Sequence, residues 1–406
     1  MKVLQINTVC GNGSVGRITV DISHALEKSG DECLIAYGRR KAPEGVNAWR
    51  FGTDLDMGFH VLHTFLKGEH GFASGKQTKK LIEKIKTYDP DVIHLHNIHG
   101  FYLDTEQLFD YLRRAGKPVV WTLHDCWPFT GHCAYFDYAG CDKWKEQCET
   151  CPLHRSAYPY ALFKDNSRGN YIRKKKMLKD RPIPGLTIVT PSRWLADLVQ
   201  ESFLQEYPVR VIHNGIDLSR FRPDVSGQGA LRKELGLEDK YVILGVANMW
   251  EERKGYPYFL ELAEELGEDF RVILIGLDKK KLKSLPSNII GLSRTDSVEE
   301  LARYYAMADV YVNATLEDNF PTTNLEALAC GTPVITFATG GSVESVDETT
   351  GRIVPKGDLE GLKKAILDVK AHEILPEICR EKALQYDKYH RFAEYVSLYR
   401  ELKEQV

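Results

Sequence analysis

The sequence predicts an α/β protein of two domains, each built on a parallel sheet covered by helices. Short apolar segments alternate with amphipathic segments along the whole chain, which is typical of parallel strands joined by helices. With 406 residues the chain is too long for one ordinary core and fits two domains of roughly 200 residues each. The predicted boundary follows residue 212, where Asn-Gly and Arg-Pro pairs interrupt the pattern.

The first predicted domain comprises residues 1–212 and begins with a short apolar strand. Its strands are expected at residues 2–7, 32–37, 92–95, 119–123 and 187–190, and its helices at residues 18–29, 78–87, 105–115 and 193–203. A linker is expected over residues 213–226.

The second predicted domain comprises residues 227–385 and repeats the same alternation. Its strands are expected at residues 241–246, 271–275, 288–291, 310–312 and 334–335, and its helices at residues 256–266, 298–307 and 322–330. Alternation of this kind predicts parallel sheets with helices on both faces.

The most informative segment is the acidic run, residues 316–334. It places Asp318 and Glu326 on either side of an Asn-Phe-Pro bend and the first turn of a helix. Thr322, Thr323 and Asn324 are expected to cap that helix, whose N-terminus would offer N–H groups to an anion. Carboxylates accept hydrogen bonds from sugar hydroxyls. The run therefore predicts a phosphate site with a sugar on either side of it. A nucleotide diphospho-sugar has this composition, since its diphosphate lies between the ribose and the second sugar.

This run resembles the acidic signature of the family-4 retaining glycosyltransferases, which have the GT-B fold of two facing Rossmann-like domains with a cleft between them. Members usually carry Glu-x7-Glu, in which the first acid holds the donor sugar and the second holds the ribose. Here Asp318 stands at the first position with Glu317 beside it, and either can reach the sugar, while Glu326 would hold the ribose. The resemblance implies further donor contacts from the residues in between, namely Asn319, Phe320, Pro321, Thr322, Thr323 and Asn324. It also implies that residues 386–406 cross back onto the first domain.

A cationic pair followed by glycine, Arg253-Lys254-Gly255, opens a predicted helix in the second domain. Lys254 would supply a point charge and Arg253 can bond two oxygens, so the pair suits a diphosphate. The family usually carries a further Arg at the position of Met249, so here either Arg253 or a cation elsewhere in the chain would take its role. With these cations the leaving diphosphate needs no metal, and no cofactor is expected in catalysis. Taken alone, the pair is also typical of two solvated cations on the surface with no ligand.

The first strand is followed by Gly11-Asn12-Gly13-Ser14-Val15-Gly16, a literal G-x-G-x-x-G. As a dinucleotide fingerprint it would predict an oxidoreductase. The second strand ends in Arg39 and Arg40 rather than an acid, which excludes the usual NAD pattern but suits NADP. By resemblance, Gly13, Ser14 and Gly16 instead lie near the donor phosphate in the interdomain cleft.

Histidines follow two of the predicted strands of the first domain. By resemblance His124 hydrogen-bonds the donor sugar, and the alternative is a structural pair with Asp125. His94 and His96 alternate along one strand, so they share a face. A packed or cleft-lining role is expected for them, since a metal site would need a third ligand.

Four of the nine cysteines, Cys133, Cys141, Cys148 and Cys151, fall within nineteen residues in the spacing C-x7-C-x6-C-x2-C. In a cytoplasmic chain such clustering favours zinc over disulfides. We therefore expect a structural zinc site, with His132 and His154 as substitute ligands and four free thiols as the alternative. The ion would hold a loop expected to have little apolar content of its own.

The chain starts without a signal peptide and has no apolar run long enough for a membrane span, which predicts a cytoplasmic protein.

The first domain carries a positive net charge and a basic stretch at residues 168–181. That stretch indicates either contact with an anionic membrane, near a lipid-linked acceptor at its inner face, or a solvated helix face. No nucleic-acid partner is expected. The Asp54-Leu55-Asp56 triplet matches D-x-D, the metal-nucleotide signature of a different glycosyltransferase fold. It lies in a segment expected to be irregular, so we attribute the match to chance.

These observations predict a metal-independent retaining glycosyltransferase that moves a sugar from a nucleotide diphospho-sugar to a saccharide or lipid-linked saccharide. The segment from Thr122 to Trp127, with the cysteine cluster after it, resembles a subgroup found in bacterial capsule and exopolysaccharide assembly. Cell-surface polysaccharide biosynthesis is therefore the expected pathway. The alternatives are an NADP-dependent oxidoreductase that uses residues 11–16 and a catalytically silent sugar-nucleotide binding protein.

Overall fold

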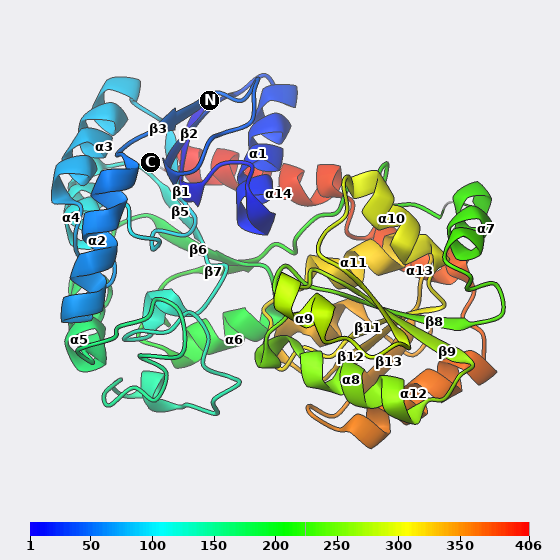
Figure 1. Ribbon diagram of the computed structural model, residues 1–406. Coiled ribbons are helices and arrows are strands. Elements are labelled where there is room, and N and C mark those ends of the chain that lie inside the picture. Colours follow the sequence, from blue (N-terminus) through cyan, green and yellow to red (C-terminus); the bar gives the residue numbers. More distant parts are fainter. Residues whose placement is uncertain (224, 406) are drawn as a thin grey trace. The chain divides into compact units, whose positions relative to one another are not determined.

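The computed structural model describes the backbone of residues 1–223 and 225–405, and the side chains of all of these except residues 225–228. The chain divides into two compact units (Figure 1). The first unit contains residues 1–213 and the C-terminal segment from Tyr389 onward, and the second runs from Asn214 to Lys388. Each unit is an α/β unit with one wholly parallel sheet, as the alternating pattern predicts.

The sheet of the first unit has seven strands in the order β3-β2-β1-β4-β5-β6-β7. The strands are β1 (Lys2–Val9), β2 (Glu32–Arg39), β3 (Ala48–Arg50), β4 (Val92–Leu95), β5 (Val119–Thr122), β6 (Leu186–Thr190) and β7 (Val209–Val211). This is the Rossmann-like order, and its direction reverses between β1 and β4. Segments that follow these two strands therefore meet where ligands of such sheets bind.

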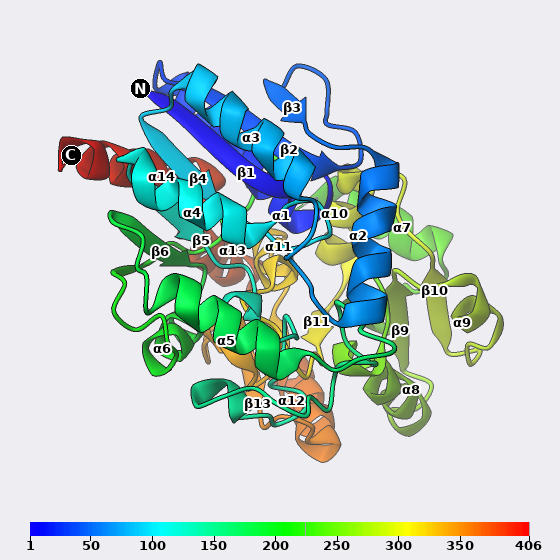
Figure 2. The same cartoon turned by 90° about the vertical axis from the view of Figure 1, so that its left-hand side faces the viewer.

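Helices cover both faces of the first sheet (Figures 1 and 2). They are α1 (Gly13–Lys28), α2 (Asp54–Lys67), α3 (Gly75–Tyr88), α4 (Thr105–Ala115), α5 (Ser167–Leu178), α6 (Arg193–Glu201) and the C-terminal α14 (Lys388–Glu404), with short 3-10 turns η1 (Trp127–Phe129) and η2 (Lys143–Lys145). The helix α14 packs with α1, β1 and β2, and the Tyr399 hydroxyl lies 2.6 Å from His94 Nδ1. The C-terminal segment thus completes the core of the first unit.

The sheet of the second unit has six strands in the order β10-β9-β8-β11-β12-β13. The strands are β8 (Tyr241–Val246), β9 (Phe270–Ile275), β10 (Ile289–Leu292), β11 (Val310–Asn313), β12 (Val334–Phe337) and β13 (Gly351–Val354). The helical elements are α7 (Val225–Glu234), η3 (Glu252–Lys254), α8 (Tyr256–Glu265), α9 (Lys279–Lys283), α10 (Val298–Met307), α11 (Thr322–Ala329), η4 (Gly340–Ser345), α12 (Leu359–Ala371) and α13 (Pro376–Leu384). The order again reverses once, between β8 and β11.

The segment predicted as a linker, residues 213–226, differs from the expectation. Asp224 lies outside the described residues. Ile216 and Phe221 are buried in the core of the second unit, and the Ile216 N–H donates to the Tyr386 carbonyl at 2.7 Å. Backbone pairing with residues 386–388 therefore makes the first part of this segment an integral part of the second unit.

The prediction of an irregular segment around Asp54-Leu55-Asp56 is wrong, because these residues form the first turn of α2. The Asp56 carboxylate accepts from the Thr53 backbone N–H at 2.9 Å, and the Thr53 hydroxyl accepts from the Asp56 N–H at 3.2 Å. This reciprocal capping box explains why two acids stand at the start of the helix. Within the described part of the chain, none of the helices is long and apolar enough to cross a membrane.

Polar side chains occupy the buried face of α2. His60 is 1 % exposed, with Nδ1 2.8 Å from the Ser74 hydroxyl, and Nε2 accepts from the Gly71 N–H at 3.3 Å. Burial, together with a smaller contribution from the charge of His63, lowers the pKa of His60 from 6.5 to about 3. His60 is therefore neutral in the folded protein at neutral pH.

Because the unfolded chain binds a proton at His60 near pH 6.5 and the folded chain does not, stability is lost as the pH falls below 6.5. We expect His60→Gln to reduce the stability lost between pH 7 and pH 5 by roughly 2 kcal/mol. Urea unfolding of parent and variant at the two pH values measures this difference. Thr64→Val, which changes the same buried face without a titrating group, is the control and should keep the parental pH dependence.

Candidate functional site

The second unit brings the acidic run and the cationic turn together at the point where its strand order reverses. The turn η3 follows β8 and the acidic run follows β11, and these two strands are neighbours. The Leu316 N–H donates to the Arg253 carbonyl at 2.9 Å, so the two segments are also joined through their backbones. Ligands of open parallel sheets bind at this kind of position.

Two ion pairs connect the cationic turn to the acidic run. Lys254 Nζ lies 2.5 Å from Asp318 Oδ2, and the two side chains are 25 % and 20 % exposed. Arg253 Nε lies 4.0 Å from Glu317 Oε1, and Arg253 also donates to the Glu317 carbonyl at 3.4 Å. The predicted diphosphate cations and the predicted sugar acids therefore lie at one place, with Asp318 more exposed than Glu317, which is 3 % exposed.

Gly255 makes this close approach feasible. Its φ of +79° lies in the left-handed region, and a Cβ atom there would meet the Ala314 carbonyl oxygen at 2.0 Å. Any larger residue would push the cationic turn away from the end of β11. Glycine at this position thus sets the distance between Lys254 and Asp318.

Glu326 lies on the buried side of α11, where it is 6 % exposed. The Tyr305 hydroxyl, from α10, donates to Glu326 Oε2 at 2.9 Å. Burial raises the pKa of Tyr305 well above its usual value, and the charge of Glu326 adds to the effect, so the phenol stays protonated as a donor. Sequence reasoning did not identify Tyr305, because its contact with Glu326 depends on how α10 packs against α11.

The expectation that Thr322, Thr323 and Asn324 cap α11 is wrong. Pro321 is the N-cap residue, and it makes no side-chain capping hydrogen bond. The Asn324 side chain instead accepts from Asn313 Nδ2 at 2.8 Å and donates to the Ser345 hydroxyl at 3.2 Å. Asn324 therefore ties α11 to β11 and η4 rather than capping the helix.

The bend before α11 is packed rather than exposed. Asn319 and Phe320 are 4 % exposed, and the Phe320 ring lies 5.8 Å from that of Tyr386. The Phe320 carbonyl accepts from Asn214 Nδ2 at 3.3 Å. Met249, at the position where the family usually has Arg, is 62 % exposed. The donor contacts of residues 319–324 stay predictions.

In the first unit the glycine loop connects β1 to α1. The Gly11 N–H donates to the Gly16 carbonyl at 2.8 Å and closes the loop. Gly16 is buried, and a Cβ there would lie 3.1 Å from the Gly11 nitrogen. Gly13 and Ser14 are exposed at the first turn of α1. Their expected approach to a donor phosphate stays a prediction.

His124 follows β5 and is 8 % exposed, with Nε2 3.1 Å from Nδ1 of His96. Burial lowers its pKa to about 4 although the charge of Asp125 opposes this, so His124 is neutral at pH 7. Asp125 pairs with His99, whose Nε2 lies 2.8 Å from Asp125 Oδ2, and it also acts electrostatically on His124. The alternative role, a structural pair of His124 with Asp125, also stays a prediction. Contact of His124 with the donor sugar stays a prediction.

His94 and His96 are fully buried and packed, with ring centroids 3.9 Å apart. His94 Nε2 lies 2.8 Å from the Thr122 hydroxyl, and His96 Nε2 lies 2.9 Å from Gln5 Oε1. Burial lowers the pKa of both rings well below the usual value. They are members of a neutral polar network in the core, as the packed role predicts.

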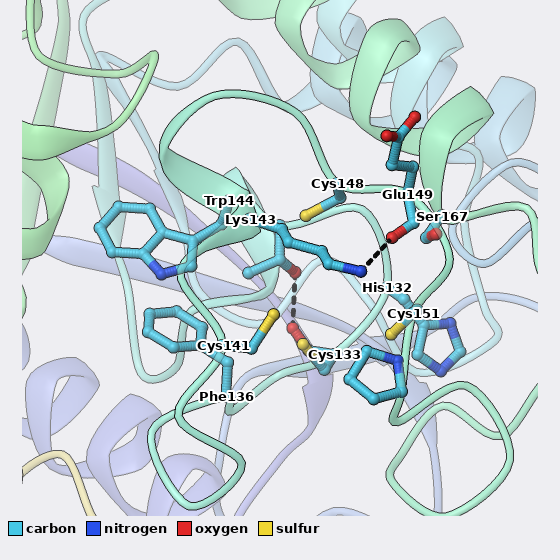
Figure 3. A pocket seen from close by; sticks show the side chains of 12 residues that line it. His132, Cys133, Phe136, Cys141, Lys143, Trp144, Cys148, Glu149, Cys151 and Ser167 are labelled. Atoms are coloured by element: carbon cyan, nitrogen blue, oxygen red, sulfur yellow. Dashed lines mark hydrogen bonds between the residues drawn. The ribbon is translucent and has the colours of Figure 1, made fainter.

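The four clustered cysteines lie in the long connection between β5 and α5 and line one small pocket (Figure 3). All four are free thiols. The loop also has an aromatic core of Phe129, Phe136 and Trp144, so the expectation that it has little apolar content is wrong. Among residues 1–223 and 225–405, no three or more His, Cys, Asp or Glu side chains are arranged as a ready-made metal site. The zinc site stays a prediction.

The basic stretch, residues 168–181, does not form a continuous solvated face. Lys174 is 2 % exposed, and its Nζ donates to the Trp127 and Thr130 carbonyls at 2.6 and 3.0 Å. Arg173 pairs with Glu106 at 2.6 Å, and Arg181 with Asp110 at 3.2 Å. Part of the predicted positive charge is therefore internal or neutralised.

Comparison with known families and structures agrees with this geometry. The family model described as Glycosyltransferase Family 4 matches residues 13–220, and the model described as Glycosyl transferases group 1 matches residues 240–372. A putative colanic acid biosynthesis glycosyl transferase, WcaC of Escherichia coli (strain K12), is 24 % identical over 99 % of this chain and 100 % of its own length.

Solved structures of the same fold align over nearly the whole chain. Sucrose-phosphate synthase of Thermosynechococcus elongatus is 16 % identical, with a TM-score of 0.70 and complete coverage of both chains. Anabaena Alr3699/HepE in complex with UDP-glucose is 16 % identical, with a TM-score of 0.65 over 98 % of this chain and 99 % of that one. The two Rossmann-like units therefore constitute a GT-B fold.

Proposed function

The chain belongs to glycosyltransferase family 4, and from this premise we propose that it transfers a sugar from a nucleotide diphospho-sugar to a saccharide acceptor with retention of configuration. The observation that carries the proposal is the meeting of Lys254 and Asp318 at the strand reversal of the second unit, with Glu326 on the helix that follows. The relation to HepE, whose structure contains UDP-glucose, supports a nucleotide-sugar donor. The relation to WcaC supports cell-surface polysaccharide biosynthesis.

In the proposed mechanism the cations of η3 carry the donor diphosphate. Lys254 would exchange its contact with Asp318 for phosphate oxygens, and Arg253 and the N-terminus of α11 would add charge and N–H donors. The bond from the anomeric carbon to the phosphate breaks, and the acceptor oxygen bonds that carbon on the same face. The departing phosphate takes the proton of the acceptor hydroxyl. These groups supply the charge stabilisation without a divalent cation.

The two acids are proposed to hold the two sugars of the donor. Glu326, oriented by Tyr305, would accept from the ribose hydroxyls. Asp318 would accept from the transferred sugar, because it is more exposed than Glu317. Glu317 would orient Arg253, which it contacts at 4.0 Å.

The proposal is tested by incubating the protein with UDP-, GDP- and ADP-sugars and a pool of saccharide acceptors in excess EDTA. We expect release of nucleoside diphosphate and a product with the anomeric configuration of the donor. Lys254→Ala should lower kcat about 100-fold, which is the loss of one preorganised electrostatic contact. Lys363→Ala, which removes a surface Lys paired with Glu265 at 2.8 Å, is the control and should keep parental turnover.

Three outcomes would contradict the proposal. Turnover that requires added Mg²⁺ or Mn²⁺ would reject metal independence. Nucleotide-sugar binding without turnover for any acceptor would indicate a silent binding protein. Oxidation of NADPH without diphosphate release would restore the oxidoreductase alternative, which the comparisons do not favour.

Because Glu326 and Asp318 are proposed to hold different sugars of the donor, replacing each of them should reduce affinity for different ligands. Glu326→Gln should weaken nucleoside diphosphate and nucleotide sugar equally, by about tenfold or ~1.4 kcal/mol, because the ribose is common to both. Asp318→Asn should weaken only the nucleotide sugar. Calorimetric titration of both ligands measures this, with Asp368→Asn, a surface acid paired with Arg352 at 2.7 Å, as the control. Equal losses for both ligands in the Asp318 variant would contradict the assignment.

We further propose that the acceptor is lipid-linked and that the first unit rests on an anionic membrane through the α2 stripe, defined as Leu55, Phe59, Leu62 and Leu66. These side chains are 50–78 % exposed and recur on the side of α2 opposite the buried His60 and Thr64. Leu162 and Phe163 extend the stripe, since the Phe163 N–H donates to the Phe65 carbonyl at 3.3 Å. Exposed apolar side chains that recur along one face of a helix mark a contact site.

Cations at one end of the stripe favour a membrane over a second copy of the chain. Lys67, Lys164 and Arg168 are exposed near the C-terminus of α2. An anionic lipid surface would neutralise them, whereas a symmetric dimer through the same patch would bring like charges near one another.

Sedimentation with lipid vesicles tests this contact. We expect the parent to sediment with phosphatidylglycerol-containing vesicles and the double variant Phe59→Ser/Leu62→Ser to lose at least tenfold in affinity, since burial of two large side chains contributes several kcal/mol. Leu375→Ser/Leu384→Ser, in which two equally exposed leucines of the second unit are changed, is the control. A parental dimer that the first double variant lacks, without vesicle binding, would assign the stripe to a second copy.

A further inference from the structure

We propose that the loop between β5 and α5 binds one structural Zn²⁺ through the thiolates of Cys133, Cys141, Cys148 and Cys151. The first observation is convergence: cysteines up to eighteen positions apart in the sequence line the same pocket (Figure 3). The cavity between them has a volume of about 10 Å³, which is room for a single atom. Four sulfur ligands suit a tetrahedral zinc ion.

The second observation is that buried polar atoms of the pocket lack partners in the described part of the chain. His132 Nε2 and Trp144 Nε1 belong to residues that line the same pocket, and neither atom has a hydrogen-bond partner there. Buried polar groups are rarely left in this state, so two in one small pocket indicate a missing bound group. Trp144 can donate to sulfur, and His132 can bind metal.

His132 has the arrangement of a nitrogen prepared to meet a ligand. The ring bonds the backbone carbonyl of Ala157, and Nε2 is the nitrogen left without a partner. Metal-binding histidines are held in this way, with the other ring nitrogen on a carbonyl. His132 is therefore the alternative to one of the four cysteines as the fourth zinc ligand. The zinc content of a His132 variant and of cysteine variants distinguishes the two arrangements.

The backbone and a buried cation supply the surroundings that thiolates need. The Gly131 N–H bonds the Cys148 sulfur, and the Leu153 N–H bonds the Cys151 sulfur. Cys133 and Cys151 also contact each other through their side chains. Lys174, fully buried on α5, acts electrostatically on Cys133 and Cys148. A zinc ion with four thiolates carries a net charge of −2, which such donors and a nearby ammonium group stabilise.

Binding of Zn²⁺ requires only the exchange of protons for the metal ion. The ion displaces the four S–H protons, which pass to solvent, and forms four Zn–S bonds without any change of oxidation state. The four sulfurs are not yet in a metal-site arrangement, so we infer that they rotate onto the ion within the loop. Coupling of metal binding to the closure of a loop is usual for structural zinc. The ion would hold the long connection, which is stabilised otherwise by its aromatic core.

Elemental analysis of freshly purified, reduced full-length protein tests the proposal. We expect about one zinc per chain in the parent. Cys141→Ser and Cys151→Ser should each retain less than a fifth of that zinc, whereas Cys379→Ser, which removes a buried free thiol in the second unit, should retain it all. His132→Gln should keep the zinc if four thiolates bind it, and loss in His132→Gln with retention in one cysteine variant would replace that cysteine by His132.

A second measurement on the parent protein does not depend on the folding of variants. Chelation under native conditions should make four additional thiols reactive and lower the midpoint of thermal unfolding, and added Zn²⁺ should reverse both changes. Zinc absent from the fresh parent, or chelation that releases zinc without exposing thiols, would overturn the proposal. A disulfide between Cys133 and Cys151 in protein purified without reductant, with no zinc, would overturn it as well. None of these results depends on glycosyl transfer.

Discussion

The contact between Gly255 and Ala314 is the constraint on which the candidate site depends. With no Cβ, Gly255 allows the turn after β8 to lie directly against the end of β11. This approach places Lys254 next to Asp318 and joins the Arg253 carbonyl to the backbone of the acidic run. The parallel sheet places the two segments next to each other, because β8 and β11 are adjacent where the strand order reverses. Gly255 allows the two backbones to come into direct contact.

The charges at this site are arranged as pairs rather than as one cationic patch. Lys254 and Asp318 are both partly exposed, so their mutual attraction is moderated by water and can be exchanged for a ligand. Glu317 is buried and remains beside Arg253. In the proposed function the diphosphate would take Lys254 from Asp318 and thereby release that carboxylate to accept from a sugar hydroxyl. The same pair would then serve both binding of the donor and orientation of its sugar.

The first unit differs in that its core contains several histidines. His94, His96 and His124 are buried next to one another, and burial keeps each of them neutral. The loop that carries the four cysteines begins immediately after His124 and Asp125. Any group that holds this loop therefore also limits the movement of the histidine network. The proposed structural ion would act on His124 through this connection rather than by contact with a substrate.

The sequence alone determined the class of fold, most strand positions and the residues that meet in the second unit. Apolar alternation located β4, β8 and α4 to the residue, since such periodicity is a local property. The acidic run and Arg253-Lys254-Gly255 could be recognised because their spacing lies within single segments. The tertiary structure alone decided that Tyr305 orients Glu326, that Asp125 pairs with His99, that Asn324 ties α11 to its neighbours and that Lys174 points inward. Each of these contacts joins residues whose separation in space depends on how helices and loops pack, which no local pattern encodes.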